Sequence, residues 1–233
     1  MSTGSVETGV FVMPVFLDKG EQSVTWLNGA INSILAQTSP DWRLVIVEDA
    51  SPLPSIESVL KDVASRDNRI HIIRSKTNQG PGTARNIGIS WAYENNFPIV
   101  LFLDYDDIAH PDRLRVVQEI MANDPAIGVV YSTFQVIDEN DRELSWDELS
   151  APIQEILECN RSNPPQGETA WISIGTVTGY ANLTSSTAAR TEIARKHPFF
   201  ACGVSEDAHA WLRYAAEGKK FVYEGSIPTL YRI

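Results

Sequence analysis

Short apolar runs alternate with helix-forming segments through the first half of the chain. The runs predict strands that are buried on both faces, and they cover residues 10–15, 43–47, 70–73, 99–103 and 127–131. Between them, helices are predicted near residues 26–35, 55–64, 84–93 and 111–121. Strands that alternate with helices in this way indicate βαβ units and a mainly parallel sheet.

The pattern changes after residue 131. Residues 133–144 predict an edge strand and a turn, and residues 145–167 are mixed, acidic and contain proline, with a short helix near 153–158. This second segment is a candidate lid or insertion. A short strand at 185–189, an amphipathic helix at 207–217 and a strand at 221–223 complete the chain. One domain with a regular first half and a variable second half is the simplest interpretation.

Composition narrows the classes of function. The chain has 233 residues, of which 43% are hydrophobic, so it can bury an ordinary core. Its net charge of −11 argues against nucleic-acid binding and against docking on an anionic membrane. Two cysteines, Cys159 and Cys202, make no disulfide framework, and we find neither a signal peptide nor a run long enough to span a bilayer. These features predict a cytoplasmic protein with no transmembrane segment.

Acidic residues follow two of the predicted strands. Asp104, Asp106 and Asp107 come after the strand at 99–103, and Asp49 comes after the strand at 43–47. Because the carboxyl ends of parallel strands meet at one edge of a sheet, these side chains are expected on one rim. Carboxylates spaced by one residue can hold a hard divalent cation, which would bring a ligand that carries a diphosphate. Alternatively, they solvate a loop, bind turn amides or cap the next helix.

Residues 78–86 lead from a strand into a helix and carry glycines at positions 80 and 82. Such glycines allow the backbone to approach a ligand, and amides at a helix N-terminus attract phosphate. Arg85 falls in the first turn of this helix, which is unfavourable for a cation unless an anion lies nearby. That anion is either a bound diphosphate or one of the carboxylates of Asp49 and Asp104.

Ser205, Glu206 and Asp207 precede the last predicted helix. Ser205 fits an N-cap with acids in the first turn, whereas the functional interpretation makes one carboxylate a general base for an incoming hydroxyl. The four histidines form no pair at metal-binding helical spacing, and the G-x-S-x-G elbow of serine hydrolases is missing from the sequence.

Taken in order, these segments resemble a family 2 glycosyltransferase with the GT-A fold. The matching segments are residues 12–16, 45–51, 78–86, 102–108, 110–114, 206–213 and Gly218. The resemblance implies an α/β fold, Rossmann-like, with a central mainly parallel sheet and a smaller mixed acceptor-side sheet. It also implies a single catalytic domain over residues 1–233, with a nucleotide-binding half at about 10–131 and an acceptor-binding half at about 132–233.

The resemblance assigns donor-binding roles. Asp49 would hydrogen-bond the nucleobase, usually uracil, near the backbone of Pro14 and Val15. Asp104 would reach the ribose, and Arg85 would lie near the nucleotide. The donor would be a nucleotide sugar, with UDP as the expected nucleotide.

The resemblance also assigns the metal and the base. Asp106 would bind Mn²⁺ or Mg²⁺ that bridges the diphosphate, with Asp107 as a further metal residue. Asp207 would be the catalytic base, and Glu206 beside it would contact the sugar or the acceptor. The implied reaction is an inverting, metal-dependent transfer to a hydroxyl of a saccharide or glycoconjugate acceptor.

Some residues depart from the family pattern. Glu48 replaces the more usual first aspartate, Pro52 follows Ser51, and Phe16 stands where tyrosine is frequent, so details of nucleobase recognition stay open. The chain stops at Ile233, where many relatives continue, so it is either a module of a longer protein or a minimal enzyme. Two alternatives remain: a nucleotide-sugar nucleotidyltransferase, whose glycine- and arginine-rich signature residues 16–20 lack, and a non-catalytic nucleotide- or glycan-binding module.

Overall fold

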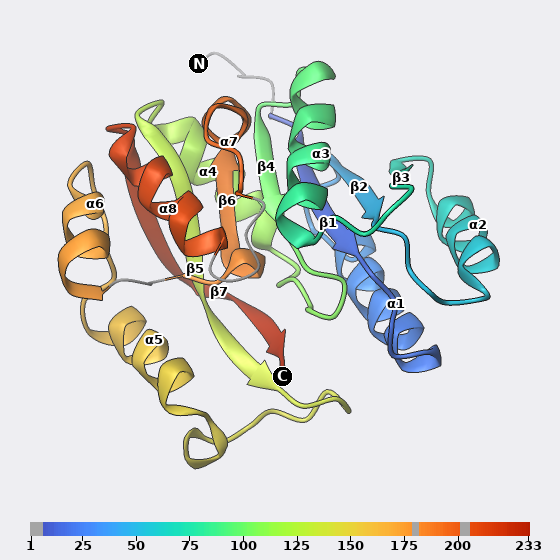
Figure 1. Cartoon of the computed structure of the whole chain (residues 1–233). Helices are drawn as coiled ribbons and strands as arrows, with labels where there is room; N and C mark the ends of the chain where they lie inside the picture. Colours follow the sequence, from blue (N-terminus) through green and yellow to red (C-terminus); the bar gives the residue numbers. More distant parts are fainter. Residues whose placement is uncertain (1–6, 179–181, 201–205) are drawn as a thin grey trace.

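One mixed sheet of seven strands forms the centre of the protein (Figure 1). The computed structural model describes residues 7–178, 182–200 and 206–233. The strand order is β3-β2-β1-β4-β6-β5-β7, and only β6 runs antiparallel to its neighbours in this sheet. The mainly parallel sheet predicted from the sequence is therefore confirmed. The strands are β1 (Gly9–Val15), β2 (Trp42–Glu48), β3 (Ile70–Arg74), β4 (Ile99–Phe102), β5 (Ile127–Ile137), β6 (Thr187–Arg190) and β7 (Lys220–Arg232).

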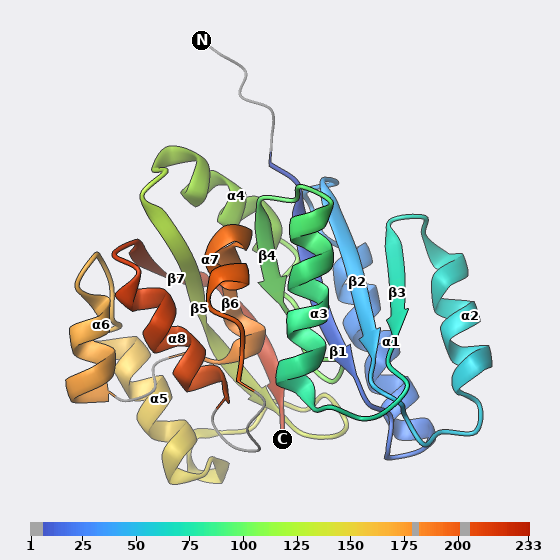
Figure 2. The same cartoon turned by 45° about the horizontal axis from the view of Figure 1, so that its top comes forward.

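Helices cover both faces of this sheet (Figure 2). One face packs against α1 (Glu21–Leu35), α2 (Ile56–Arg66) and α4 (Arg113–Asn123). The opposite face packs against α3 (Pro81–Glu94), α6 (Ala170–Ser173), α7 (Thr191–Lys196) and α8 (Glu206–Ala216). The molecule thus has the three layers expected of an α/β fold.

Burial on both faces explains why the strands are apolar without alternation. In β1, Phe11 and Met13 join the core beneath α1 and α4, whereas Val10 and Val12 join the core beneath α3 and α8. All four side chains are fully buried. A strand covered on one face would have shown polar residues at every second position.

Helix α3 lies unusually close to the sheet because Gly88 faces it. A Cβ atom at Gly88 would come within 2.5 Å of Cγ1 of Val12 and within 3.3 Å of Cγ1 of Val45. The helix begins after Gly80, whose φ of 84° falls in the left-handed region that favours glycine. Close packing of α3 therefore brings its first turn to the carboxyl edge of β1 and β2.

The second half of the chain differs from the sequence expectation in its details. Strand β5 continues past residue 131, because Phe134 and Val136 pack into a third cluster with Leu157 of α5 (Ala151–Ser162). Residues 134–137 pair with 229–232 of β7, so the smaller sheet expected in the second half is a two-stranded continuation of the main sheet. The helix predicted from residue 111 begins at Arg113.

Several short elements in the second half are not apparent from periodicity. The strand predicted at 185–189 is β6 at Thr187–Arg190, and a 3₁₀ turn precedes it. Helices of three to six residues are too short to show a hydrophobic period. The elements missed are η1 (Trp146–Glu148), α6, η2 (Ile174–Thr178), η3 (Thr184–Ser186) and α7.

Candidate active site

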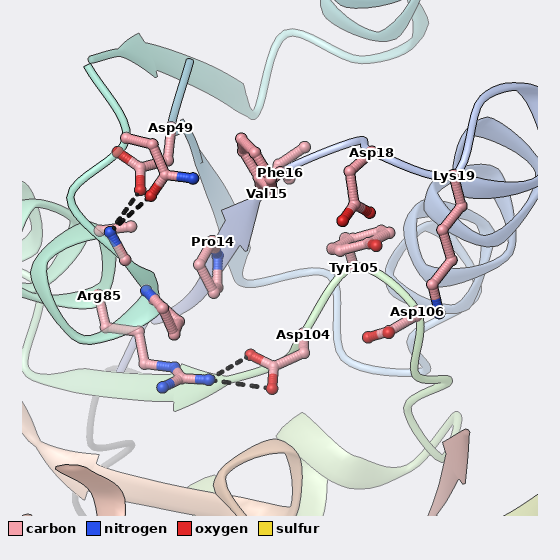
Figure 3. Close-up of a pocket in the computed structure, with 14 residues that line it drawn as sticks. Pro14, Val15, Phe16, Asp18, Lys19, Asp49, Arg85, Asp104, Tyr105 and Asp106 are labelled. Atoms are coloured by element: carbon pink, nitrogen blue, oxygen red, sulfur yellow. Dashed lines mark hydrogen bonds and ion pairs between the residues drawn. The ribbon is translucent and has the colours of Figure 1, made fainter. Parts of the chain in front are cut away.

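A cavity of about 390 Å³ opens at the carboxyl ends of β1, β2 and β4 (Figure 3). In a parallel α/β sheet this edge is where ligands bind. The lining combines strand ends, the β1–α1 loop and the first turn of α3. The lining residues are Pro14, Val15, Phe16, Asp18, Lys19, Asp49, Asn78, Gly80, Pro81, Ala84, Arg85, Asp104, Tyr105 and Asp106. All six residues predicted to bind the nucleotide are among them.

Asp49 is held at the wall of this cavity by the backbone that begins α3. Its Oδ2 accepts hydrogen bonds from the amides of Gln79 at 2.9 Å and Gly80 at 2.8 Å. Its Oδ1 is buried and accepts no hydrogen bond from the described residues. A buried carboxylate oxygen without a donor is costly, so this atom fits a ligand that presents an N–H group.

Arg85 pairs with Asp104 across the same cavity. One guanidinium nitrogen, Nη2, donates to both carboxylate oxygens, at 2.7 and 3.0 Å. Arg85 is buried, and its guanidinium lies 5.5 Å from the ring centre of Phe199. Of the two kinds of anion expected near Arg85, the structure provides a carboxylate of the protein, that of Asp104.

Asp106 points into the cavity from the loop after β4 (Figure 3). Burial raises its pKa to about 6, and the nearby charge of Asp104 adds to this effect, whereas the cations of Arg232 and Lys19 oppose it. Two carboxylates that repel one another at a solvent-accessible cavity would be stabilised by a divalent cation.

Asp107 is placed differently from its neighbour. It is buried, it does not line the cavity, and its Oδ1 accepts a hydrogen bond of 2.9 Å from the amide of Arg232. Burial raises its pKa well above the usual value, with added effects of Asp106 and Asp104. The structure therefore brings Asp106 to the cavity and turns Asp107 toward the end of β7.

Asp207 lies in the first turn of α8 and does not line the cavity. Its carboxylate accepts hydrogen bonds from the hydroxyl of Thr184 at 3.2 Å and from the amide of Ala208 at 2.8 Å. Next to Thr184 in η3, the hydroxyl of Ser185 accepts a hydrogen bond from the amide of Asp104 at 2.9 Å. The side chain of Glu206, the other predicted catalytic residue, lies outside the described part of the structure, as does Ser205.

The structure adds three residues to those predicted. Lys19 and Tyr105 line the cavity, and burial, followed by the charges of Asp106 and Asp18, raises the pKa of Tyr105 to about 12. Burial also raises the pKa of Tyr231 to about 12, with added effects of four carboxylates. Those carboxylates belong to Asp107, Asp104, Asp106 and Asp207.

The charges of the loop acids after β4 and of Asp207 therefore both act on Tyr231. Its position depends on the register of β7, in which Tyr231 faces Val136 of β5. The sequence held no signal for that register. Tyr105 lies within the acidic motif, so the sequence could have indicated it. Lys19 differs from other polar residues after a strand in no way that the sequence shows.

Hard oxygen ligands at the cavity fit Mg²⁺ or Mn²⁺ when a phosphate completes the site. Within residues 7–178, 182–200 and 206–233, no three His, Cys, Asp or Glu side chains are grouped to hold a metal ion. Asp104 and Asp106 of the loop after β4 both line the cavity with their carboxylates. Mg²⁺ is commonly bound by one or two carboxylates together with substrate phosphates, so this donor set fits a cation that arrives with a diphosphate.

None of the described helices has the length and apolar character needed to cross a membrane.

A family model matches most of this chain. The model described as "Glycosyl transferase family 2" matches residues 11–180. An uncharacterized glycosyltransferase of Nostoc sp. is 33% identical over 127 residues, which are 54% of this chain and 38% of that protein. The succinoglycan biosynthesis protein ExoW of Rhizobium meliloti is 37% identical over 92 residues, 38% of this chain and 27% of that protein. The chain thus spans well under half the length of these relatives.

Solved structures share the fold at low sequence identity. S. aureus TarS superposes with a TM-score of 0.70 at 16% identity, covering 97% of this chain and 37% of that chain. A form of TarS comprising residues 1–349 has been solved in complex with UDP. A mannosyltransferase of Pyrobaculum calidifontis, in complex with GDP-Man and Mn²⁺, superposes with a TM-score of 0.67 at 15% identity, covering 96% of this chain and 56% of that chain. The GT-A fold expected from the sequence is confirmed.

Proposed function

Because this chain belongs to glycosyl transferase family 2, we propose that it is an inverting, metal-dependent glycosyltransferase with a nucleoside diphosphate sugar as donor. The sugar passes to a hydroxyl of a saccharide or glycoconjugate acceptor. One cavity carries the proposal, because it presents both a pair of carboxylates, at Asp104 and Asp106, and the Oδ1 of Asp49, which accepts no hydrogen bond from the described residues. The pair of carboxylates suits a cation with a diphosphate, and the Oδ1 of Asp49 suits a nucleobase.

The nucleobase end of the donor belongs beside Asp49. The buried Oδ1 of Asp49 needs a donor, and uracil N3 and guanine N1 both carry a hydrogen atom, whereas cytosine N3 does not. Pro14 and Val15 at the end of β1 form the neighbouring wall. This supports UDP as the first candidate and GDP as the second, which agrees with the nucleotides bound to TarS and to the Pyrobaculum mannosyltransferase.

The diphosphate end of the donor belongs beside Asp106. Asp104, fixed by Arg85, is in position to accept from a ribose hydroxyl, and Asp106 would hold Mn²⁺ or Mg²⁺. When bound, such a cation stabilises the negative charge that develops on a departing diphosphate. Asp107 supports this loop through its hydrogen bond with the backbone of β7.

Asp207 acts as the general base in this proposal. An acceptor hydroxyl is a poor nucleophile until a carboxylate accepts its proton during attack. Thr184 orients the carboxylate of Asp207, and the adjoining Ser185 fixes the backbone of Asp104, so η3 connects base and donor acids. Attack from the side opposite the departing diphosphate inverts the anomeric carbon. Glu206 is proposed to contact the sugar or the acceptor.

In this proposal, the two halves of the domain bind different substrates. Residues of about 10–131 bind the nucleotide, and residues of about 132–233 bind the acceptor, with 145–175 shaping acceptor choice because loops carry specificity on a fixed scaffold. A cytoplasmic location stays a prediction from the sequence. The nucleotidyltransferase and the non-catalytic binding module remain as alternatives that differ in their products.

Product analysis tests the proposed reaction. The chain is incubated with Mn²⁺, a panel of UDP- and GDP-sugars and a panel of saccharide acceptors, with Asp207→Asn as the control. We expect release of nucleoside diphosphate and an anomeric configuration in the product opposite to that of the donor, both lost in Asp207→Asn. Release of pyrophosphate would identify a nucleotidyltransferase instead. Nucleotide binding without any product would support the non-catalytic module.

A further inference from the structure

The loop between β1 and α1 carries a lysine at the mouth of the cavity. Its backbone is fixed at two points: the amide of Leu17 donates to the hydroxyl of Ser51 at 2.9 Å, and the amide of Lys19 donates to the hydroxyl of Ser23 at 2.8 Å. Gly20 follows with a φ of 61°, a conformation that favours glycine. These contacts place Lys19 at a defined position on the cavity wall.

The side chain of Lys19 is directed toward the acidic motif. Its ammonium lies 4.9 Å from the ring centre of Trp26, whose indole N–H donates to the carbonyl of Glu139 at 3.2 Å. Trp26 is buried, so it forms a rigid support. Figure 3 shows the ammonium end of Lys19 on the same side of the cavity as Asp106. Lys19 itself is exposed, so its head group is open to a ligand.

Charge in the cavity is unbalanced for an anionic ligand. Four carboxylates line it, those of Asp18, Asp49, Asp104 and Asp106, against the two cations Lys19 and Arg85. The whole chain carries a net charge of −11. Arg85 is buried and paired with Asp104. The ammonium of Lys19, by contrast, forms no salt bridge with a carboxylate among the described residues; it lies over the ring of Trp26, and its charge acts on Asp106.

We propose that Lys19 is a further donor-binding residue, and that its ammonium contacts the diphosphate of the nucleotide sugar. The inference rests on the proposed function and adds to it a protein cation on the phosphate groups. A diphosphate that enters this cavity brings at least two negative charges next to four carboxylates. Lys19 offsets part of this repulsion from a site that already exists before the ligand arrives.

The charge of Lys19 acts in opposite directions on a diphosphate and on a metal ion. Removing the ammonium takes a favourable charge away from a diphosphate. It also takes a repulsive charge away from a divalent cation that approaches Asp106. Loss of Lys19 should therefore weaken diphosphate binding without weakening metal binding. A variant that merely distorted the β1–α1 loop would weaken both.

Binding titrations on the whole chain test this inference. Wild type is titrated with UDP and GDP in the presence of Mn²⁺. The tighter nucleotide with Mn²⁺, its nucleoside, and Mn²⁺ alone are then compared across Lys19→Met, Lys19→Arg and Lys61→Ala. Methionine retains an unbranched apolar side chain beside Trp26 without the charge, and Lys61 is an exposed lysine of α2 that does not line the cavity. We expect Lys19→Met to lose on the order of tenfold in affinity for the nucleoside diphosphate.

The other titrations decide what that loss means. In Lys19→Met, the affinity for the nucleoside should stay within about twofold of wild type, and the affinity for Mn²⁺ should be equal or higher. Lys19→Arg should recover most of the affinity for the nucleoside diphosphate. Lys61→Ala should match wild type in all three titrations. Unchanged diphosphate affinity in Lys19→Met would overturn the inference and leave the proposed function intact. Parallel losses for nucleoside, diphosphate and Mn²⁺ would also overturn it, as a loop defect. Wild type that binds neither UDP nor GDP would overturn the proposed function and the inference together.

Discussion

The hydroxyl of Thr184 donates a hydrogen bond of 3.2 Å to the carboxylate of Asp207. Thr184 is buried in a short 3₁₀ turn, and its neighbour Ser185 accepts a hydrogen bond from the amide of Asp104. Consecutive residues of one turn thus hold the proposed base and the proposed donor-binding acid. Thr229 of β7 holds this 3₁₀ turn in place, because its hydroxyl donates to the carbonyl of Ser185 at 3.0 Å.

Removing the Thr184 hydroxyl should slow transfer without changing donor affinity. In Thr184→Val the side chain keeps its volume but no longer orients Asp207, and we expect a decrease in kcat of about fivefold. Thr184→Ser retains the hydroxyl and should stay within about twofold of wild type. Steady-state kinetics of nucleoside diphosphate release measure both. A larger effect on the KM of the donor than on kcat would contradict a role at the base.

Replacing the proposed base should abolish chemistry but leave nucleotide binding. Asp207→Asn keeps the shape and the contact with Thr184 but cannot accept a proton, so kcat should fall on the order of 10³-fold. The affinity for UDP should remain within about twofold, because Asp207 does not line the donor cavity. Kinetics and calorimetric titration of the same preparation measure the two quantities. Near-normal turnover in this variant would remove Asp207 from the proposed role.

Asp49→Asn should change which nucleobase is preferred. The side-chain oxygen of asparagine can still accept from the amides of Gln79 and Gly80, and its NH₂ group then replaces Oδ1 at the cavity. A donor at this point repels uracil N3–H and suits cytosine N3. We expect UDP affinity to fall and CDP affinity to rise, each by about tenfold. Titrations with UDP and CDP measure this exchange, and an equal loss for both nucleotides would contradict it.

The pKa of Asp106 predicts an unusual dependence of stability on pH. Burial and the charge of Asp104 raise this pKa to about 6, from 3.8 for an ordinary aspartate. Between these pH values the folded chain binds more protons than the unfolded chain, so this residue's contribution to stability falls as the pH rises through the window. Asparagine has nearly the same shape as aspartate and does not titrate, so Asp106→Asn lacks this pH-dependent contribution to stability.

We therefore expect Asp106→Asn, without divalent cations, to exceed wild type in its free energy of unfolding by on the order of 2 kcal/mol at neutral pH. The difference should shrink toward zero near the pKa of an ordinary aspartate. Denaturant titrations across this pH range measure it. Parallel pH curves for the two proteins would show that Asp106 titrates normally.

Two helix glycines should respond oppositely to alanine. A Cβ atom at Gly88 would meet Val12 at 2.5 Å, so Gly88→Ala should cost about 2 kcal/mol of stability through displacement of α3. At Gly29 in α1 a Cβ atom meets nothing within 4 Å, and alanine should add about 0.5 kcal/mol through helix propensity. Denaturant unfolding measures both. Equal effects would contradict the close packing of α3 on β1.

The sequence was sufficient for the parts of the fold and site that depend on strong local patterns. Apolar runs buried on both faces predicted the parallel strands, and the carboxyl ends of β2 and β4 predicted that Asp49 and Asp104 share one rim. Arg85 in the first turn of α3 required an anion, and the structure provides Asp104. These inferences needed only the direction of strands and helices.

Other features depend on tertiary register and could not be predicted. Asp106 and Asp107 are adjacent, but one lines the cavity and the other bonds the backbone of Arg232. Which carboxylate turns inward is decided by β7, whose Leu230 pairs with Ile108 just after the motif. The same pairing brings Tyr231 among the acids. A bridge between residues more than a hundred positions apart leaves no signal in local periodicity.

Calorimetric titration of UDP with and without Mn²⁺, on wild type and Asp106→Ala, tests the central claim most directly. The account predicts that UDP binds wild type tightly only when Mn²⁺ is present, and that Asp106→Ala binds UDP equally weakly with and without the metal. A thermal melt of the variant confirms that it is folded. If UDP bound wild type and Asp106→Ala alike, the assignment of this cavity as a metal-dependent donor site would be contradicted.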